Sequence, residues 1–137
     1  METATDPIFG DVISRYTRSQ AIEDGVLVDL SEWAGRGENG MLGGFSCPVA
    51  VTQAVWSEIK WVPKSGAGSD GDVRGRAHDV LWMARCAARG ARPGVSELLF
   101  RVSMPIGKGG PLRTYKLVAG PGDEGELVMT IMLPHED

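Results

Sequence analysis

The chain has 137 residues, enough for one domain, because two domains of half this length would each have a marginal core. Hydrophobic residues make up 42% of the chain and charged residues 23%, values typical of globular proteins, which excludes wholesale disorder. The formal net charge of −4 argues against a protein that binds nucleic acid through charge alone.

The first residues of the chain bear on its compartment. Residues 1–6 are acidic and have no apolar core, so they lack the pattern of a secretory signal. No apolar run approaches the roughly 18 residues that a membrane-spanning helix requires. We therefore expect a cytoplasmic protein without a membrane partner, in which Cys47 and Cys86 are reduced thiols.

A strand, a short helix and a second strand are predicted within residues 12–30. Thr17 followed by Gln20 is the capping-box pattern, in which the two residues satisfy each other's free backbone groups, so a helix should begin after Thr17. Gly25 stands where a left-handed helix cap is expected. Residues 26–30 are rich in branched apolar side chains, which is typical of a buried strand.

Two glycine-rich segments flank the next predicted elements. Residues 35–44 and 64–75 should be flexible loops, and the first lacks the strand and the apolar helix that a phosphate-binding loop requires. Between them, residues 49–51 should be extended, and Thr52 should cap a helix over residues 53–60. Apolar residues give this helix one face that can pack on a core.

The strongest helical pattern lies in residues 76–89. Apolar side chains recur there at the three- and four-residue spacing of one buried stripe. Trp82, Met83 and Cys86 would broaden this stripe, so we expect two sides of the helix to be covered. A buried Cys86 would behave as a small hydrophobic side chain.

Alternating apolar residues predict three strands, in residues 98–104, 112–119 and 127–133, joined by turns into a β-meander. Such a sheet has one apolar face and needs a covering helix. The predicted fold is therefore α+β, in a single domain of residues 1–137. Its small antiparallel sheet contains this meander plus the N-terminal strands, and two main helices pack on one face.

Charge is unevenly distributed along the chain. Residues 1–62 and 120–137 each carry a net charge of −5, whereas residues 63–119 carry +6. The acidic segments favour an acidic face that docks onto a basic partner, with charges spread over a solvated surface as the alternative. The basic segment raises a second alternative, a phosphate-binding face near Trp82 and Tyr115. Its candidate residues are Arg74, Arg76, Arg85, Arg89, Arg92, Arg101, Lys108, Arg113 and Lys116.

Three segments carry a resemblance to a known family. They read YTRSQAIEDGVLVD in residues 16–29, DVLWMA in residues 79–84, and GPGDEGE in residues 120–126 running into TIMLP in residues 130–134. Together these motifs resemble a family of small bacterial proteins carried on mobile genetic elements and classified as a domain of unknown function. The resemblance covers nearly the whole chain, although residues 35–44 are richer in glycine than the family's usual link. It implies a setting in which accessory proteins often inhibit host defences, including CRISPR effectors, and it supplies no catalytic residues.

The sequence offers little support for a metal or a cofactor. His78 and His135 stand far apart and the two cysteines are isolated, so no ligand pair has zinc spacing. Residues 12–30 do resemble the opening of ADP-ribosyltransferases, which use NAD. That resemblance implies that Arg15 or Arg18 would hold the nicotinamide ribose and that Glu124 or Glu126 would polarise the sugar.

The favoured hypothesis is a non-enzymatic, protein-binding accessory factor of a mobile element. The specific expectation is an anti-CRISPR inhibitor that binds an effector complex and blocks recognition of target DNA. The expected partner is a host protein or ribonucleoprotein with a basic groove, whereas direct binding of nucleic acid is not expected. The candidate contact residues are Glu23, Asp24, Asp29, Asp123, Glu124 and Glu126, with Trp33 and Trp61 as anchors. An NAD-using transferase and a small nucleic-acid-binding protein remain the alternatives.

Overall fold

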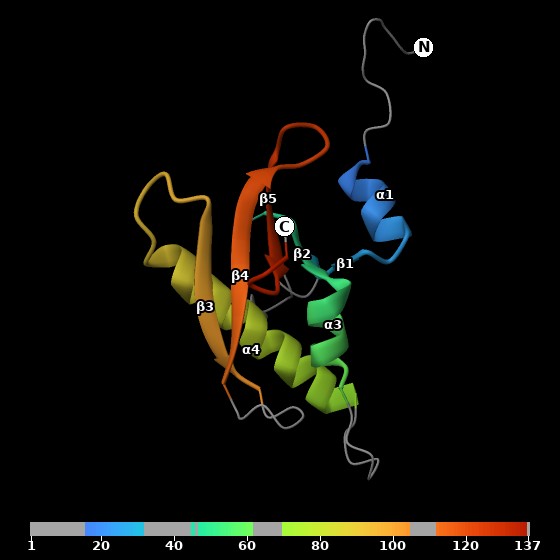
Figure 1. Ribbon diagram of the computed structural model, residues 1–137, viewed down its shortest axis with the longest axis vertical. Coiled ribbons are helices and arrows are strands. Elements are labelled where there is room, and N and C mark those ends of the chain that lie inside the picture. Colours follow the sequence, from blue (N-terminus) through green and yellow to red (C-terminus); the bar gives the residue numbers. More distant parts are fainter. Residues whose placement is uncertain (1–15, 32–44, 46, 62–69, 105–111, 137) are drawn as a thin grey trace, which may run out of the picture.

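The computed structural model describes residues 16–31, 45, 47–61, 70–104 and 112–136. The helices are α1 (Arg18–Glu23), α3 (Gln53–Ile59) and α4 (Asp70–Arg89). The strands are β1 (Leu27–Asp29), β2 (Val49–Thr52), β3 (Glu97–Ser103), β4 (Leu112–Pro121) and β5 (Leu127–Met132). This is the predicted α+β fold (Figure 1).

The five strands form one sheet in the order β1-β2-β5-β4-β3. The predicted meander is confirmed, because β4 pairs antiparallel with both β3 and β5. Strand β1 pairs antiparallel with β2, and β2 lies parallel to β5, with Val51 opposite Ile131. The N-terminal strands therefore join the meander through β5, which becomes the centre of the sheet.

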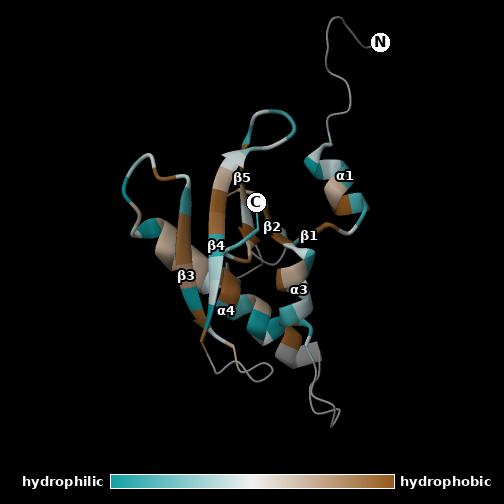
Figure 2. Ribbon diagram, in the orientation of Figure 1, coloured by the Kyte–Doolittle hydropathy of each residue, from teal (hydrophilic) through white to brown (hydrophobic). Residues whose placement is uncertain are grey.

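Helices α3 and α4 cover one face of the sheet, as predicted. Helix α4 runs across β3 and β4, and α3 lies beside the N-terminal part of α4 (Figure 1). Alternate residues of the strands face these helices. Hydrophobic and hydrophilic colours are mixed along β3 and β4 (Figure 2). The shared core includes Val49, Val51, Val55, Ile59, Ala77, Val80, Leu81, Ala84, Phe100, Tyr115, Leu117 and Ile131.

The other face of the sheet is partly covered by the C-terminal residues. The Glu136 carboxylate accepts hydrogen bonds from the Thr52 hydroxyl at 2.8 Å and from the Leu133 backbone N–H at 2.7 Å. The Glu136 carbonyl accepts a hydrogen bond from Lys116 Nζ. Lys116 is buried on this face, where its Nζ bonds to this carbonyl and lies 4.0 Å from the Glu97 carboxylate.

Helix α4 begins at Asp70 rather than at residue 76, so residues 70–75 of the predicted loop are helical. Val73 is partly buried against the core and extends the apolar stripe by one turn before Ala77. Burial of this stripe outweighs the low helix propensity of Gly75. The rest of the predicted loops, residues 35–44 and 64–69, lies outside the described residues, as do residues 12–15 of the first predicted strand.

The prediction that α4 is covered on two sides is wrong. Trp82 is 42% exposed, Met83 is 41% exposed, and Cys86 is exposed as well. The Trp82 ring stacks on His78, with centroids 6.1 Å apart, and the Arg85 guanidinium lies 5.5 Å from its centroid. These three side chains shield one another on the outer face of α4, so the helix buries only its inner stripe.

None of the described helices is long and apolar enough to cross a membrane.

Candidate functional site

The motif of residues 16–29 includes the N-terminus of α1. The predicted capping box is confirmed: Thr17 Oγ1 accepts the backbone N–H of Gln20 at 3.0 Å, and Gln20 Oε1 accepts the backbone N–H of Thr17 at 2.9 Å. Asp123 of the β4–β5 turn adds a second cap. Its carboxylate accepts the backbone N–H groups of Arg18 at 2.7 Å and Ser19 at 3.0 Å. The first and last motifs of the sequence therefore meet in space.

The Arg18 side chain attaches α1 to the central strand. Its guanidinium donates to Thr130 Oγ1 and to the carbonyl of Met129, both at 2.8 Å. Burial lowers the pKa of the half-buried Arg18 guanidinium, and the nearby carboxylates of Asp29, Asp123 and Glu126 oppose this shift. Arg18 is therefore a positive charge enclosed by carboxylates from β1 and from the β4–β5 turn.

The β4–β5 turn is built around Gly122. The Glu126 carboxylate folds back over it, so that a Cβ at position 122 would lie 2.6 Å from the carboxylate carbon. Glu126 Oε1 accepts the backbone N–H of Glu124 at 3.0 Å, which fixes the side chain on the turn. Gly125 has a φ of 84°, a conformation that glycine adopts without strain. Hydrophilic colours cover this turn (Figure 2).

The structure brings the six predicted acidic residues together around α1. Glu23 and Asp24 lie at the C-terminal end of the helix, Asp29 lies on β1, and the other three lie on the β4–β5 turn. All six are exposed. We define the acidic surface as Glu23, Asp24, Asp29, Asp123, Glu124 and Glu126.

Hydrogen bonds hold several of these carboxylates in place. Asp24 Oδ2 accepts the Tyr16 hydroxyl at 2.7 Å, and this bond raises the pKa of Tyr16. Asp29 Oδ1 accepts the Ser31 hydroxyl at 2.6 Å and the Ser31 backbone N–H at 3.0 Å. These bonds hold the carboxylates of Asp24 and Asp29 in a defined geometry.

Of the two predicted tryptophan anchors, Trp61 lies away from the acidic surface. Trp61 is 37% exposed and follows the C-terminal end of α3, where its carbonyl accepts Arg76 Nη2 at 2.6 Å. The opposite end of α3 adjoins the acidic surface, because the Gln53 N–H donates to the carbonyl of Val26. The length of α3 therefore separates Trp61 from the acidic surface. Trp33 lies outside the described residues.

The basic residues predicted for a phosphate-binding face are divided among several environments. Arg113 pairs with the Glu58 carboxylate at 3.1 Å, and the buried Tyr115 hydroxyl donates to the same carboxylate at 2.7 Å. Arg76 caps the end of α3, and Lys116 is buried on the opposite face of the sheet. These residues, together with Tyr115, therefore do not form one phosphate-binding face.

Other basic residues of that prediction remain at the surface or outside the described chain. Arg74, Arg89, Arg92 and Arg101 are exposed, Arg85 is half-buried, and Lys108 falls in an undescribed segment. The cluster of Glu58 with Arg113 and Tyr115 was missed by sequence reasoning. Alternation within β4 does place both residues on the helix-covered face, but the partner on α3 carries no sequence signal.

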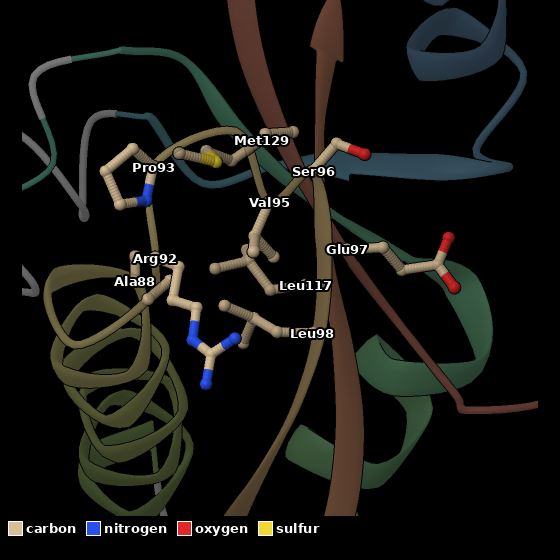
Figure 3. A pocket seen from close by; sticks show the side chains of 11 residues that line it. Ala88, Arg92, Pro93, Val95, Ser96, Glu97, Leu98, Leu117 and Met129 are labelled. Carbon is tan, nitrogen blue, oxygen red and sulfur yellow. The ribbon is translucent and has the colours of Figure 1, made fainter.

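The transferase alternative would require Arg18 and a glutamate of the turn to line a common pocket. Arg18 and Glu126 do lie near one another, yet each is bonded to the protein itself. A pocket of about 230 Å³ lies at the C-terminal end of α4, where Val95, Leu98 and Leu117 point toward one another (Figure 3). A second, on the sheet face opposite α4, measures about 510 Å³. Neither described pocket is lined by Arg18, Glu124 or Glu126, and Arg15 is outside the described residues.

Potential metal ligands are scattered over the described residues. No group of three or more His, Cys, Asp or Glu side chains there could hold a metal ion. His78 is engaged with Trp82, and Cys86 is exposed. Cys47 is half-buried, which raises the pKa of its thiol, and Arg18 acts in the opposite direction.

Most of the chain matches one protein family. The profile of a family of unknown function, DUF6573, matches residues 8–137. The chain belongs to DUF6573. The match includes α1, the whole sheet and the β4–β5 turn, so the contacts of Arg18 and Asp123 lie within the DUF6573 region. The search of curated proteins and the search of solved structures found no match.

Proposed function

We propose that the protein acts by binding, with its acidic surface placed against a basic surface of another macromolecule. The observation that carries this proposal is that the carboxylates of Asp29, Asp123 and Glu126 lie near the guanidinium of Arg18. Glu23, Asp24 and Glu124 are exposed on the adjoining end of α1 and on the same turn. Six negative charges and one positive charge leave about five negative charges on one region of a small protein. Such a region attracts a positive partner and repels nucleic acid.

The internal hydrogen bonds of this region favour binding. Carboxylates that are already held by Tyr16, Ser31 and the turn lose little freedom when a partner arrives, so less ordering entropy opposes association. Glu23 and Glu124 project from the same region without a described hydrogen bond to their carboxylates, and both are exposed. They are suited to make direct ion pairs with lysine or arginine.

The partner we propose is a protein whose basic groove normally holds nucleic acid. In the specific form of this proposal the protein is an accessory factor of a mobile genetic element, and the groove is the DNA-binding channel of a CRISPR effector complex. Support for this form comes from the acidic surface and from the mobile-element setting that the sequence resemblance implies. The association would be mainly electrostatic, so it should weaken as the salt concentration rises.

The proposal is tested by competition for target DNA. A purified effector complex and a fluorescent target duplex are titrated with the protein at two salt concentrations. We expect DNA binding to be lost with a simple competitive dependence, and less efficiently at the higher salt. Retention of DNA by the complex at low salt, with the protein in large excess, would refute the specific form of the proposal.

A further inference from the structure

Strand β3 is an edge strand with one neighbour among the described residues. In the sheet order β1-β2-β5-β4-β3 it pairs with β4 alone, and it runs the full seven residues Glu97–Ser103 (Figure 1). An edge strand of this kind presents backbone N–H and C=O groups that can pair with another strand.

The pairing pattern identifies which backbone groups point outward. The Ala119 N–H donates to the carbonyl of Ser96 at 2.8 Å, and the register places Glu97 opposite Val118. In an antiparallel pair, residues alternate between those that bond the partner strand and those that do not. Glu97, Leu99, Arg101 and Ser103 therefore direct their N–H and C=O groups toward the free edge.

The side chains of the same four residues lie on the sheet face opposite α4, and all four are exposed. Leu99, at the centre of the strand, is 61% exposed. Natural edge strands are usually protected by lysine, proline or a bulge at such positions. In β3 the residues on either side of Leu99 on this face are Glu97 and Arg101, whose opposite charges do not repel an antiparallel strand of the same sequence.

We propose that a second copy of this chain occupies the edge, with the two β3 strands antiparallel about a two-fold axis at Leu99. In this register Leu99 faces Leu99, and Glu97 of each copy faces Arg101 of the other. Each facing pair of outward residues exchanges two backbone hydrogen bonds. Glu97 and Arg101 make the strand self-complementary, because every charge in the antiparallel pair meets its opposite.

This inference goes beyond the proposed function and does not depend on it. Strand β3 and strand β1 are at opposite edges of the sheet, and the acidic surface lies beside β1. A dimer through β3 would therefore carry one acidic surface at each end of a continuous sheet. Such a dimer could contact two basic sites at once.

The test uses the full chain and two charge variants, Glu97→Arg and Arg101→Glu. Sedimentation of the unaltered protein over a concentration series should show a monomer–dimer equilibrium, with a dissociation constant on the order of micromolar for a single strand pair. Each variant alone places like charges opposite one another twice, so its dissociation constant should rise about tenfold or more. An equimolar mixture of the two variants should dimerise again, because each copy then meets the opposite charge.

A third variant keeps the test decisive if one of the charge variants fails to fold. Leu99→Pro removes an outward N–H that β4 does not use, so it should keep the pairing with β4, checked by circular dichroism, and abolish dimerisation. Lys116 Nζ lies 4.0 Å from the Glu97 carboxylate, so an arginine at position 97 could repel Lys116 and unfold the protein. In that case Arg101→Glu and Leu99→Pro still test whether β3 forms the dimer. A monomer at all concentrations, a dimer that these variants leave unchanged, or a variant mixture that stays monomeric would each overturn the proposal.

Discussion

The backbone N–H of Arg18 donates to the carboxylate of Asp123 at 2.7 Å, although the two residues are 105 positions apart in the chain. The same carboxylate accepts the N–H of Ser19, so the β4–β5 turn caps α1 from outside the helix. Arg18 in turn bonds the carbonyl of Met129 on β5. Helix and turn are therefore one unit, and the acidic surface depends on their joint geometry.

Removal of this cap should lower stability. Asp123→Ala leaves two N–H groups of α1 without their acceptor, and we expect the free energy of unfolding to fall by about 1 kcal/mol, within the roughly 0.5–2 kcal/mol range of lost caps. Urea unfolding measures this difference. Glu124→Ala removes the same charge from the same turn and should change stability by less than about 0.5 kcal/mol. Equal losses in the two variants would contradict the capping role.

Gly122 and Glu126 should be energetically coupled. A methyl group at position 122 displaces the Glu126 carboxylate, whose Oε1 then loses the N–H of Glu124, so Gly122→Ala should cost about 1 kcal/mol. In a Glu126→Ala background no carboxylate lies over position 122, so Gly122→Ala should leave the free energy of unfolding nearly unchanged. A double-mutant cycle by urea unfolding measures the coupling. A coupling energy near zero would show that the carboxylate does not occupy this position.

The Tyr115 hydroxyl should make stability depend on alkaline pH. Burial, with the hydrogen bond to Glu58 next, raises the pKa of Tyr115 well above its ordinary value of 10.0. Above pH 10 the unfolded chain then binds fewer protons than the folded one, so the free energy of unfolding should fall as pH rises. In Tyr115→Phe this fall should be shallower by about 1.4 kcal/mol per pH unit.

Tyr16 supplies the control for this measurement, since the chain has two tyrosines. In a Tyr16→Phe variant the absorbance of tyrosinate should stay low above pH 10 until the protein unfolds. The alkaline slope of stability should largely remain in that variant. Titration of Tyr115 near pH 10 in the folded state would contradict its burial against Glu58.

Glu126→Gln separates the binding proposal from the transferase alternative. Incubation of the protein with labelled NAD and a host lysate should transfer no label, because the Arg18 and Glu126 side chains are bonded within the protein. Label that is transferred by the unaltered protein and lost in Glu126→Gln would instead favour the transferase.

Local chemistry in the sequence predicted much of the fold. The Thr17–Gln20 capping box, the left-handed Gly25 and the period of two in the meander each follow from neighbouring residues. The parallel pairing of β2 with β5 joins segments about 80 positions apart, and no local pattern specifies it. Helix α4 was predicted too short because Gly75 suggested a loop, whereas packing of Val73 decided the start.

The role of the acidic residues in binding stays a prediction. The excess of acidic residues near both ends of the chain predicts an acidic face, and the fold brings Asp29, Asp123 and Glu126 together around Arg18. The dual role of Asp123, as surface charge and helix cap, could not be deduced from the sequence. It requires that the β4–β5 turn reach α1, which only the assembled sheet determines.

The most direct test of the proposed function compares two variants of equal net charge in binding to a partner captured by affinity purification. Glu124→Lys and Asp79→Lys each replace one exposed acid by lysine and change the net charge from −4 to about −2, the first on the acidic surface and the second on α4. We predict that Glu124→Lys weakens binding about tenfold or more at low salt, whereas Asp79→Lys leaves the dissociation constant nearly unchanged. Equal effects of the two variants, or none from Glu124→Lys, would contradict binding through the acidic surface.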